Sequence, residues 1–239
     1  MRPTRIGIAL ATLIGTALVT GVRADDAERL LTIDHFVALK STAPAIAGQP
    51  AQVYVRERAK AGVIARGRAS SDRVVLFVHG AGTPAEVAFD VPYQDYSWMA
   101  FLARAGFDVF SVDMTGYGRS TRPAPMNDPC NLAKERQAGF VASPCASPYP
   151  HTLTSIASDW TDIAAAVNYI RTLRHVDRVS LVAWSRGGPR AGGYAAQHPD
   201  TVRRLIVLAP GYDRNAEPNA AESTLADGEI GRASCRERV

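Results

Sequence analysis

Cysteine is scarce in this chain, with three residues among 239. Cys130 and Cys145 lie in one proline-rich insert, and Cys235 lies near the C-terminus. Two sulfurs without a nearby pair of histidines do not complete a tetrahedral site, so we expect no metal. In an oxidising compartment Cys130 and Cys145 would form a disulfide that stabilises the protein by about 3 kcal/mol. Two free thiols are the alternative.

The chain also lacks a cluster of positive charge, although its formal net charge is +4. Three of its 27 basic residues lie in residues 1–24, and three lie in residues 229–239 together with two of the 23 acidic residues. Residues 25–228 therefore carry 21 basic and 21 acidic side chains and are neutral. Binding to nucleic-acid phosphates needs clustered lysine and arginine, so we expect no nucleic-acid partner.

One apolar run, residues 6–22, is long enough to be a signal peptide or a membrane anchor. It follows a short cationic stretch with Arg2 and Arg5, and Val22 and Ala24 are small residues of the kind that precede signal-peptidase cleavage. The pattern predicts a signal peptide at 1–24 and an exported protein, periplasmic or extracellular, with no stable membrane anchor after cleavage. A retained anchor is the alternative, although about 17 residues is the short limit for a bilayer span.

Apolar patterning beyond this leader predicts strands that alternate with helices. Residues 32–39 and 52–58 alternate apolar and polar side chains, as in a half-buried hairpin. Four continuous apolar runs are typical of strands buried on both faces of a parallel sheet, and they lie at 73–78, 107–112, 179–183 and 205–209. Helical patterns separate these runs, at 96–105, 154–173 and 187–198. The sequence therefore predicts an α/β protein with a doubly wound, mostly parallel sheet that opens with an antiparallel pair.

The strongest motif is AWSRG at 183–187, between a predicted buried strand and a small-residue helix. A serine raised on a sharp strand-to-helix turn adopts strained backbone dihedrals, and the residues two before and two after it must be small. Ala183 and Gly187 meet that requirement. The motif predicts that Ser185 is a catalytic nucleophile.

A second motif, HGAG at 79–82, follows the predicted strand at 73–78. An acyl-transfer site needs two backbone N–H groups aimed at the developing oxyanion. We expect one from Arg186, which follows the nucleophile, and the other from Ala81. The loop glycines, Gly80 and Gly82, would let this segment fold close to a substrate.

His79 is expected to orient the HGAG loop by hydrogen bonding rather than to transfer a proton. The tight DMTGYGRS loop at 113–120 is interpreted as a structural turn beside the site.

Over residues 73–211 the chain resembles the α/β-hydrolase superfamily. The resemblance rests on the order and spacing of HGAG, VDMTGYGRS, the AWSRGG turn and the later AAQHPDTVRRLIVLAP segment. The insert at 123–151 is interpreted as a local elaboration on the substrate-facing side.

The resemblance implies an α/β-hydrolase fold and a serine hydrolase of esterase type that acts on a small ester-like substrate without a cofactor. Serine at the turn argues against the haloalkane- and epoxide-opening branches, which use an aspartate there. Peptidase, lactonase and peroxidase activities remain open. The alternative from another functional class is a non-catalytic domain that binds a ligand or a partner.

The resemblance also implies an acid and then a histidine downstream of Ser185. His198 ends the helix after the turn and is expected to face away from the site, and Asp213 is a possible acid. We therefore interpret residues 25–228 as an incomplete hydrolase domain that would be inactive as it stands. Residues 229–239 are basic and patternless, and one choice of codons for them reproduces a common sequencing adapter, which predicts a non-native tail. A naturally short protein is the alternative.

Overall fold

The computed structural model describes residues 24–211, apart from Arg68 and Asp95. The predicted signal peptide, Asp213 and the predicted non-native tail at 229–239 lie outside these described residues, apart from Ala24. No helix in the described part of the chain is long and apolar enough to cross a membrane.

Six strands of the described chain form one sheet in the order β1-β2-β4-β3-β5-β6. The strands are β1 (Leu30–Lys40), β2 (Pro50–Lys60), β3 (Val74–Val78), β4 (Asp108–Val112), β5 (Val179–Trp184) and β6 (Val202–Leu208). β1 and β2 form an antiparallel pair, and β2 joins the sheet antiparallel to β4. The other neighbours are parallel. The predicted doubly wound, mostly parallel sheet that opens with an antiparallel pair is confirmed.

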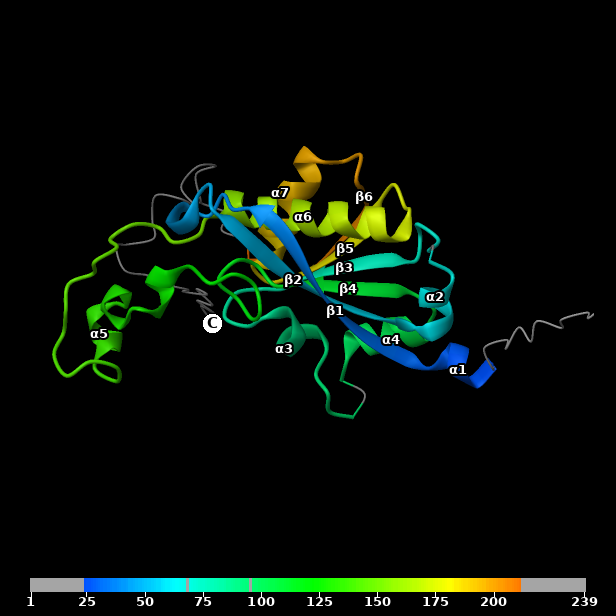
Figure 1. Cartoon of the computed structure of the whole chain (residues 1–239), viewed down its shortest axis with the longest axis horizontal. Helices are drawn as coiled ribbons and strands as arrows, with labels where there is room; N and C mark the ends of the chain where they lie inside the picture. Colours follow the sequence, from blue (N-terminus) through cyan, green and yellow to red (C-terminus); the bar gives the residue numbers. More distant parts are fainter. Residues whose placement is uncertain (1–23, 68, 95, 212–239) are drawn as a thin grey trace, which may run out of the picture.

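Helices cover both faces of this sheet, as Figure 1 shows. α6 (Ile156–Arg174) and α7 (Gly187–Gln197) lie on one face, and α3 (Ala85–Phe89) and α4 (Trp98–Arg104) lie on the other. The short elements are α1 (Ala24–Glu28), α2 (Ala61–Ala65), α5 (Lys134–Gln137), and the 3-10 helices η1 (Pro44–Ile46), η2 (Ala124–Asn127) and η3 (Pro129–Asn131).

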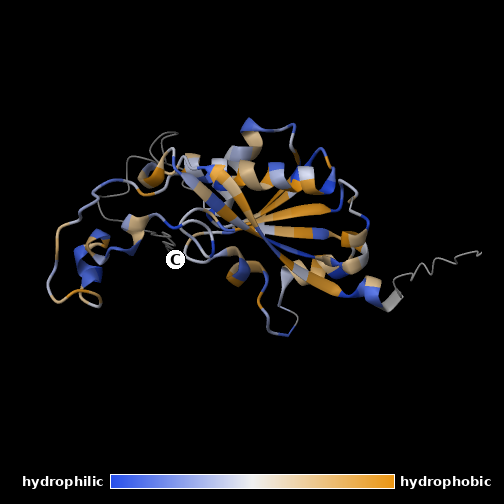
Figure 2. Ribbon diagram, viewed as in Figure 1, coloured by the Kyte–Doolittle hydropathy of each residue, from blue (hydrophilic) through white to orange (hydrophobic). Residues whose placement is uncertain are grey.

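Side-chain alternation along the central strands divides the core into two layers. In β3, Leu76 and Val78 pack into the cluster that contains Ile163 of α6, whereas Phe77 packs with Met99 of α4. These three side chains are each at most 1% exposed. Figure 2 shows the central strands as apolar along most of their length, as expected for strands that are buried on both faces.

β6 differs from its sequence-based prediction. The apolar run at 205–209 predicts a strand buried on both faces, but Ile206 is 49% exposed and Leu205 and Val207 are each 38% exposed. Within the described residues β6 pairs with β5 alone and lies at the edge of the sheet. The prediction of burial is therefore wrong for this part of the chain, because hydropathy does not report whether a strand has neighbours.

The insert at 123–151 projects beyond the sheet, next to the loop that follows β4 (Figure 1). Its centre is Gln137, which is 1% exposed and whose amide donates to the carbonyls of Cys130, Leu132 and Cys145 at 3.2, 2.9 and 3.1 Å. The Gln137 amide oxygen accepts from Cys145 N–H at 2.8 Å. The sulfurs of Cys130 and Cys145 are bonded in this structure. The redox state of the pair in an exported protein stays a prediction.

Candidate active site

Ser185 follows β5 directly, at the turn into α7. Its φ of 55° lies in the left-handed region, where a non-glycine residue is strained by roughly 1–3 kcal/mol. Three backbone hydrogen bonds hold this conformation: Ser185 N–H donates to the Leu208 carbonyl at 3.0 Å, and the Ser185 carbonyl accepts from Gly188 and Gly211 at 2.9 and 3.0 Å. The backbone strain that the sequence predicts at Ser185 is present.

Small residues around Ser185 allow two backbone segments to approach one another. A Cβ added to Gly187 would lie 2.4 Å from the Val78 carbonyl oxygen, so the start of α7 touches the end of β3. A Cβ added to Gly80 would lie 3.0 Å from the Ser185 Cβ. The structure therefore places the HGAG loop directly against Ser185, as the shared carboxyl edge of β3 and β5 requires.

The backbone N–H groups of Ala81 and Arg186 lie in the HGAG loop and at the Ser185 turn. Neither the Ala81 N–H nor the Arg186 N–H has a hydrogen-bond partner among the described residues. The Gly82 N–H, by contrast, lies 3.5 Å from the Tyr117 hydroxyl, and its φ of 83° is one that glycine adopts without strain. Ala81 and Arg186 therefore each keep an N–H group available to a ligand within the described chain, and their role as an oxyanion hole stays a prediction.

His79 is fully buried, and hydrogen bonds engage both of its ring nitrogens. Nε2 accepts from the Met114 N–H at 3.1 Å, so the ring proton is on Nδ1, which donates to the Gly80 carbonyl at 2.7 Å. Burial, reinforced by the positive charge of Arg190, lowers the pKa of His79 to about 3. His79 is therefore neutral, ties the loops after β3 and β4 together, and has no free nitrogen for proton transfer.

No described residue serves as a base for Ser185. The Ser185 hydroxyl has no hydrogen-bond partner within the described chain, and all five histidines lie in that part. His35 is bonded to Glu57 and Tyr169 at 2.8 Å each, and His198 packs on the Tyr194 ring with centroids 4.7 Å apart. Apart from His79, the remaining two are His151 in the insert and His175 at the C-terminal end of α6.

Sequence reasoning missed a buried charged group beneath the HGAG loop. Arg190 of α7 is 3% exposed, and its Nε donates to Asp159 of α6 at 2.6 Å. Its Nη1 donates to the carbonyls of both His79 and Gly80, at 3.1 and 2.9 Å. Arg190 thus joins the helix that follows Ser185 to the loop that carries the Ala81 N–H.

Asp162, one helical turn after Asp159, makes the equivalent connection to the loop after β4. Its carboxylate accepts from the Thr115 N–H at 2.7 Å and from the Thr115 hydroxyl at 3.1 Å. Burial raises the pKa of Asp162 to about 7. A pattern in the sequence could have revealed this pair, because Asp159 and Asp162 share the helix stripe of Ile163 and Val167, where a charged residue needs a buried partner.

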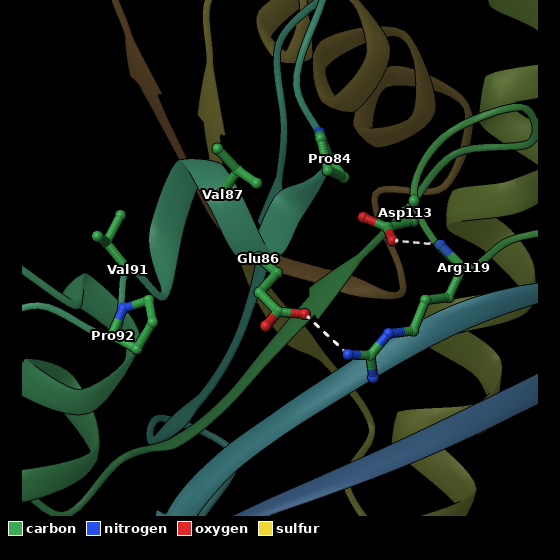
Figure 3. Close-up of a pocket in the computed structure, with 8 residues that line it drawn as sticks. Pro84, Glu86, Val87, Val91, Pro92, Asp113 and Arg119 are labelled. Atoms are coloured by element: carbon green, nitrogen blue, oxygen red, sulfur yellow. Dashed lines mark hydrogen bonds and ion pairs between the residues drawn. The ribbon is translucent and has the colours of Figure 1, made fainter.

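A cavity of about 300 Å³ lies beside the loop after β4 (Figure 3). Figure 3 shows Val87, Val91 and Pro92 on one side, and the Glu86 carboxylate facing the Arg119 guanidinium at 3.4 Å on the other. Neither Ser185 nor any residue of the HGAG loop lines this cavity, so it is separate from the candidate site. The described residues contain no group of three or more side chains that could hold a metal ion.

Comparisons with known proteins agree with this architecture. The family model described as alpha/beta hydrolase fold matches residues 73–228. A rice protein (Oryza sativa subsp. japonica) described as a probable 1-acylglycerol-3-phosphate O-acyltransferase is 28% identical over 145 residues, which are 60% of this chain and 27% of the rice protein.

Among solved structures, a probable hydrolytic enzyme from Pseudomonas aeruginosa PAO1 is 23% identical with a TM-score of 0.46, covering 75% of this chain and 42% of its own. Epoxide hydrolase I from potato (Solanum tuberosum) is 20% identical with a TM-score of 0.43, covering 78% of this chain and 43% of its own. The chain spans about a quarter of the rice protein and less than half of either solved structure. On the extent of the family match, the chain belongs to the alpha/beta hydrolase fold family.

Proposed function

We propose that the whole protein is a serine hydrolase that cleaves small ester-like substrates, with Ser185 as its nucleophile. The observation that carries the proposal is a strained serine at the β5–α7 turn, together with the Ala81 and Arg186 N–H groups, which have no hydrogen-bond partner in the described part of the chain. A binding domain without catalysis has no need for either feature, since strain at a turn costs stability and unpaired N–H groups cost desolvation.

The proposed reaction has two steps. The Ser185 hydroxyl oxygen attacks the ester carbonyl carbon while a base removes the hydroxyl proton, and the Ala81 and Arg186 N–H groups donate to the oxyanion that develops. The alcohol then departs with that proton and leaves an acyl group on Ser185. In the second step a water molecule, deprotonated by the same base, releases the acid and restores the serine.

The described residues supply no base for this mechanism, because the described histidines are engaged elsewhere or lie without contact to Ser185. Asp213 stays a proposed acid, and it lies outside the described residues. Residues 1–24 support export of the protein to the periplasm or the extracellular space.

Fluorophosphonate labelling of the full-length protein tests the proposal, with the adduct located by peptide mass spectrometry. We expect the adduct on Ser185, and we expect Ser185→Ala to abolish both labelling and turnover of p-nitrophenyl esters. Ser180→Ala is the matched control, because Ser180 lies on the same strand but pairs inside the sheet opposite Val75. Labelling that persists in Ser185→Ala, or a wild-type protein that neither labels nor turns over ester, would contradict the proposed function.

A further inference from the structure

Arg190 occupies an unusual position for a buried charge. A guanidinium that is 3% exposed is costly unless its charge is paired and its donors are satisfied. Asp159 pairs the charge at 2.6 Å, and the Tyr117 ring lies 5.4 Å from the guanidinium carbon. Its Nη1, however, donates to two consecutive backbone carbonyls of the HGAG loop, those of His79 and Gly80.

The direction of these hydrogen bonds fixes the direction of the opposite N–H groups. A trans peptide unit is planar, so its carbonyl and the following N–H point in opposite directions, and none of the described peptide bonds is cis. The Gly80 carbonyl is held by Arg190 at 2.9 Å and by His79 Nδ1 at 2.7 Å. Two donors on the Gly80 oxygen therefore orient the Ala81 N–H away from Arg190, where it has no partner among the described residues.

We propose that Arg190, held by Asp159, is a positioning residue that fixes and polarises the peptide between Gly80 and Ala81 so that the Ala81 N–H is ready to receive an oxyanion. This inference rests on the proposed function. A donor fixed before the reaction needs no reorganisation in the transition state, and a cation on the carbonyl of a peptide strengthens its N–H as a donor. Because Arg190 lies five residues after Ser185, in the helix that begins at Gly187, its hydrogen bonds also fix the loop relative to the nucleophile.

The alternative role for Arg190 is a buried ion pair that only joins α6 to α7. The chain offers a matched control for that role in Arg174, a second buried arginine, which lies in α6. Arg174 is 5% exposed and bonds to Glu57 and Asp108, in the sheet rather than at the HGAG loop. A variant at either position removes a buried arginine and destabilises the fold, but Arg190 alone touches the loop beside Ser185.

Two measurements on the full-length protein separate the roles, with Arg190→Met compared to Arg174→Met. By ¹⁵N relaxation, we expect the order parameters of Gly80 and Ala81 to fall from about 0.85 to below about 0.6 in Arg190→Met and to stay near the wild-type value in Arg174→Met. In hydrolysis of p-nitrophenyl acetate, Arg190→Met should lower kcat by roughly 10- to 100-fold with little change in KM, since loss of a whole oxyanion donor costs about 10²–10³-fold.

Equal order parameters in the two variants would overturn the inference, and so would an equal loss of kcat. If wild-type protein shows no turnover, the proposed function fails, while the relaxation comparison still decides whether Arg190 orders the loop. If Arg190→Met does not fold, Arg190→Lys against Arg174→Lys replaces the pair. A single ammonium group cannot match the planar fork that bonds to Asp159 and both carbonyls, so the loop should still loosen in Arg190→Lys alone.

Discussion

Gly187 offers a direct test of why the residue two positions after Ser185 must be glycine. In Gly187→Ala the new Cβ would lie 2.4 Å from the Val78 carbonyl oxygen and 2.9 Å from the His79 carbonyl oxygen. Both contacts are with backbone, and Val78 is paired on both sides, with Val112 and Ala183. Relief of the clash must therefore move a central strand or the start of α7. Overpacking of this kind costs about 1–3 kcal/mol, and we expect about 3 kcal/mol here, at the upper end.

Gly192→Ala is the matched control in the same helix. A Cβ at Gly192 has no atom within 4 Å, so only the intrinsic helix preference changes, and alanine should stabilise the protein by about 0.5–1 kcal/mol. Urea denaturation followed by far-UV circular dichroism measures the change in stability of both variants. In thermal melts, the midpoints of Gly187→Ala and Gly192→Ala should differ by roughly 10 °C for a domain of this size. A Gly187→Ala protein within about 1 kcal/mol of wild type would refute the argument from close approach.

Two further predictions concern groups away from Ser185. Burial and the negative charge of Glu57 raise the pKa of Asp108 to about 8, so the folded protein keeps a proton that the unfolded chain loses near pH 4. Stability should therefore fall as the pH rises from about 4 to 8, and Asp108→Asn should flatten that fall in urea midpoints measured across this range. For the insert, thiol titration of exported protein under denaturing conditions should find Cys130 and Cys145 bonded, and Cys145→Ser should cost about 3 kcal/mol. Free thiols at both positions would exclude the bridge.

The elements around Ser185 were predictable because their signals are local. A buried strand followed by AWSRG requires a sharp turn whatever the rest of the chain does, and the observed φ of 55° at Ser185 follows from that requirement. The HGAG loop is defined in the same way by the strand before it. Both motifs meet because parallel strands end at one edge of the sheet, so strand order decides their contact.

The groups that were missed depend on partners distant in sequence. Arg190 and Asp159 are 31 residues apart, and Arg190 reaches His79 across 111 residues. The acidic residues on the apolar stripe of α6 indicate that buried partners are needed, but no local pattern identifies those partners. The exposure of β6 was mispredicted for a related reason, since an apolar run reports the character of a strand and not the number of its neighbours. Each case involves a relation between elements that hydropathy cannot encode.

α6 carries a buried charged residue near each of its ends. Asp159 lies in its first turn and Arg174 in its last, so each charge is favourable with respect to the helix dipole at its own end. The apolar middle, with Ile163, Val167 and Ile170, packs on the sheet between them. At about 1.5 Å per residue the two ends are roughly 20 Å apart, beyond the range at which substitutions usually couple. The N-terminal end can therefore hold the loops around Ser185 while the C-terminal end holds Glu57 and Asp108 of the sheet, and a change at one end is measurable without disturbing the other.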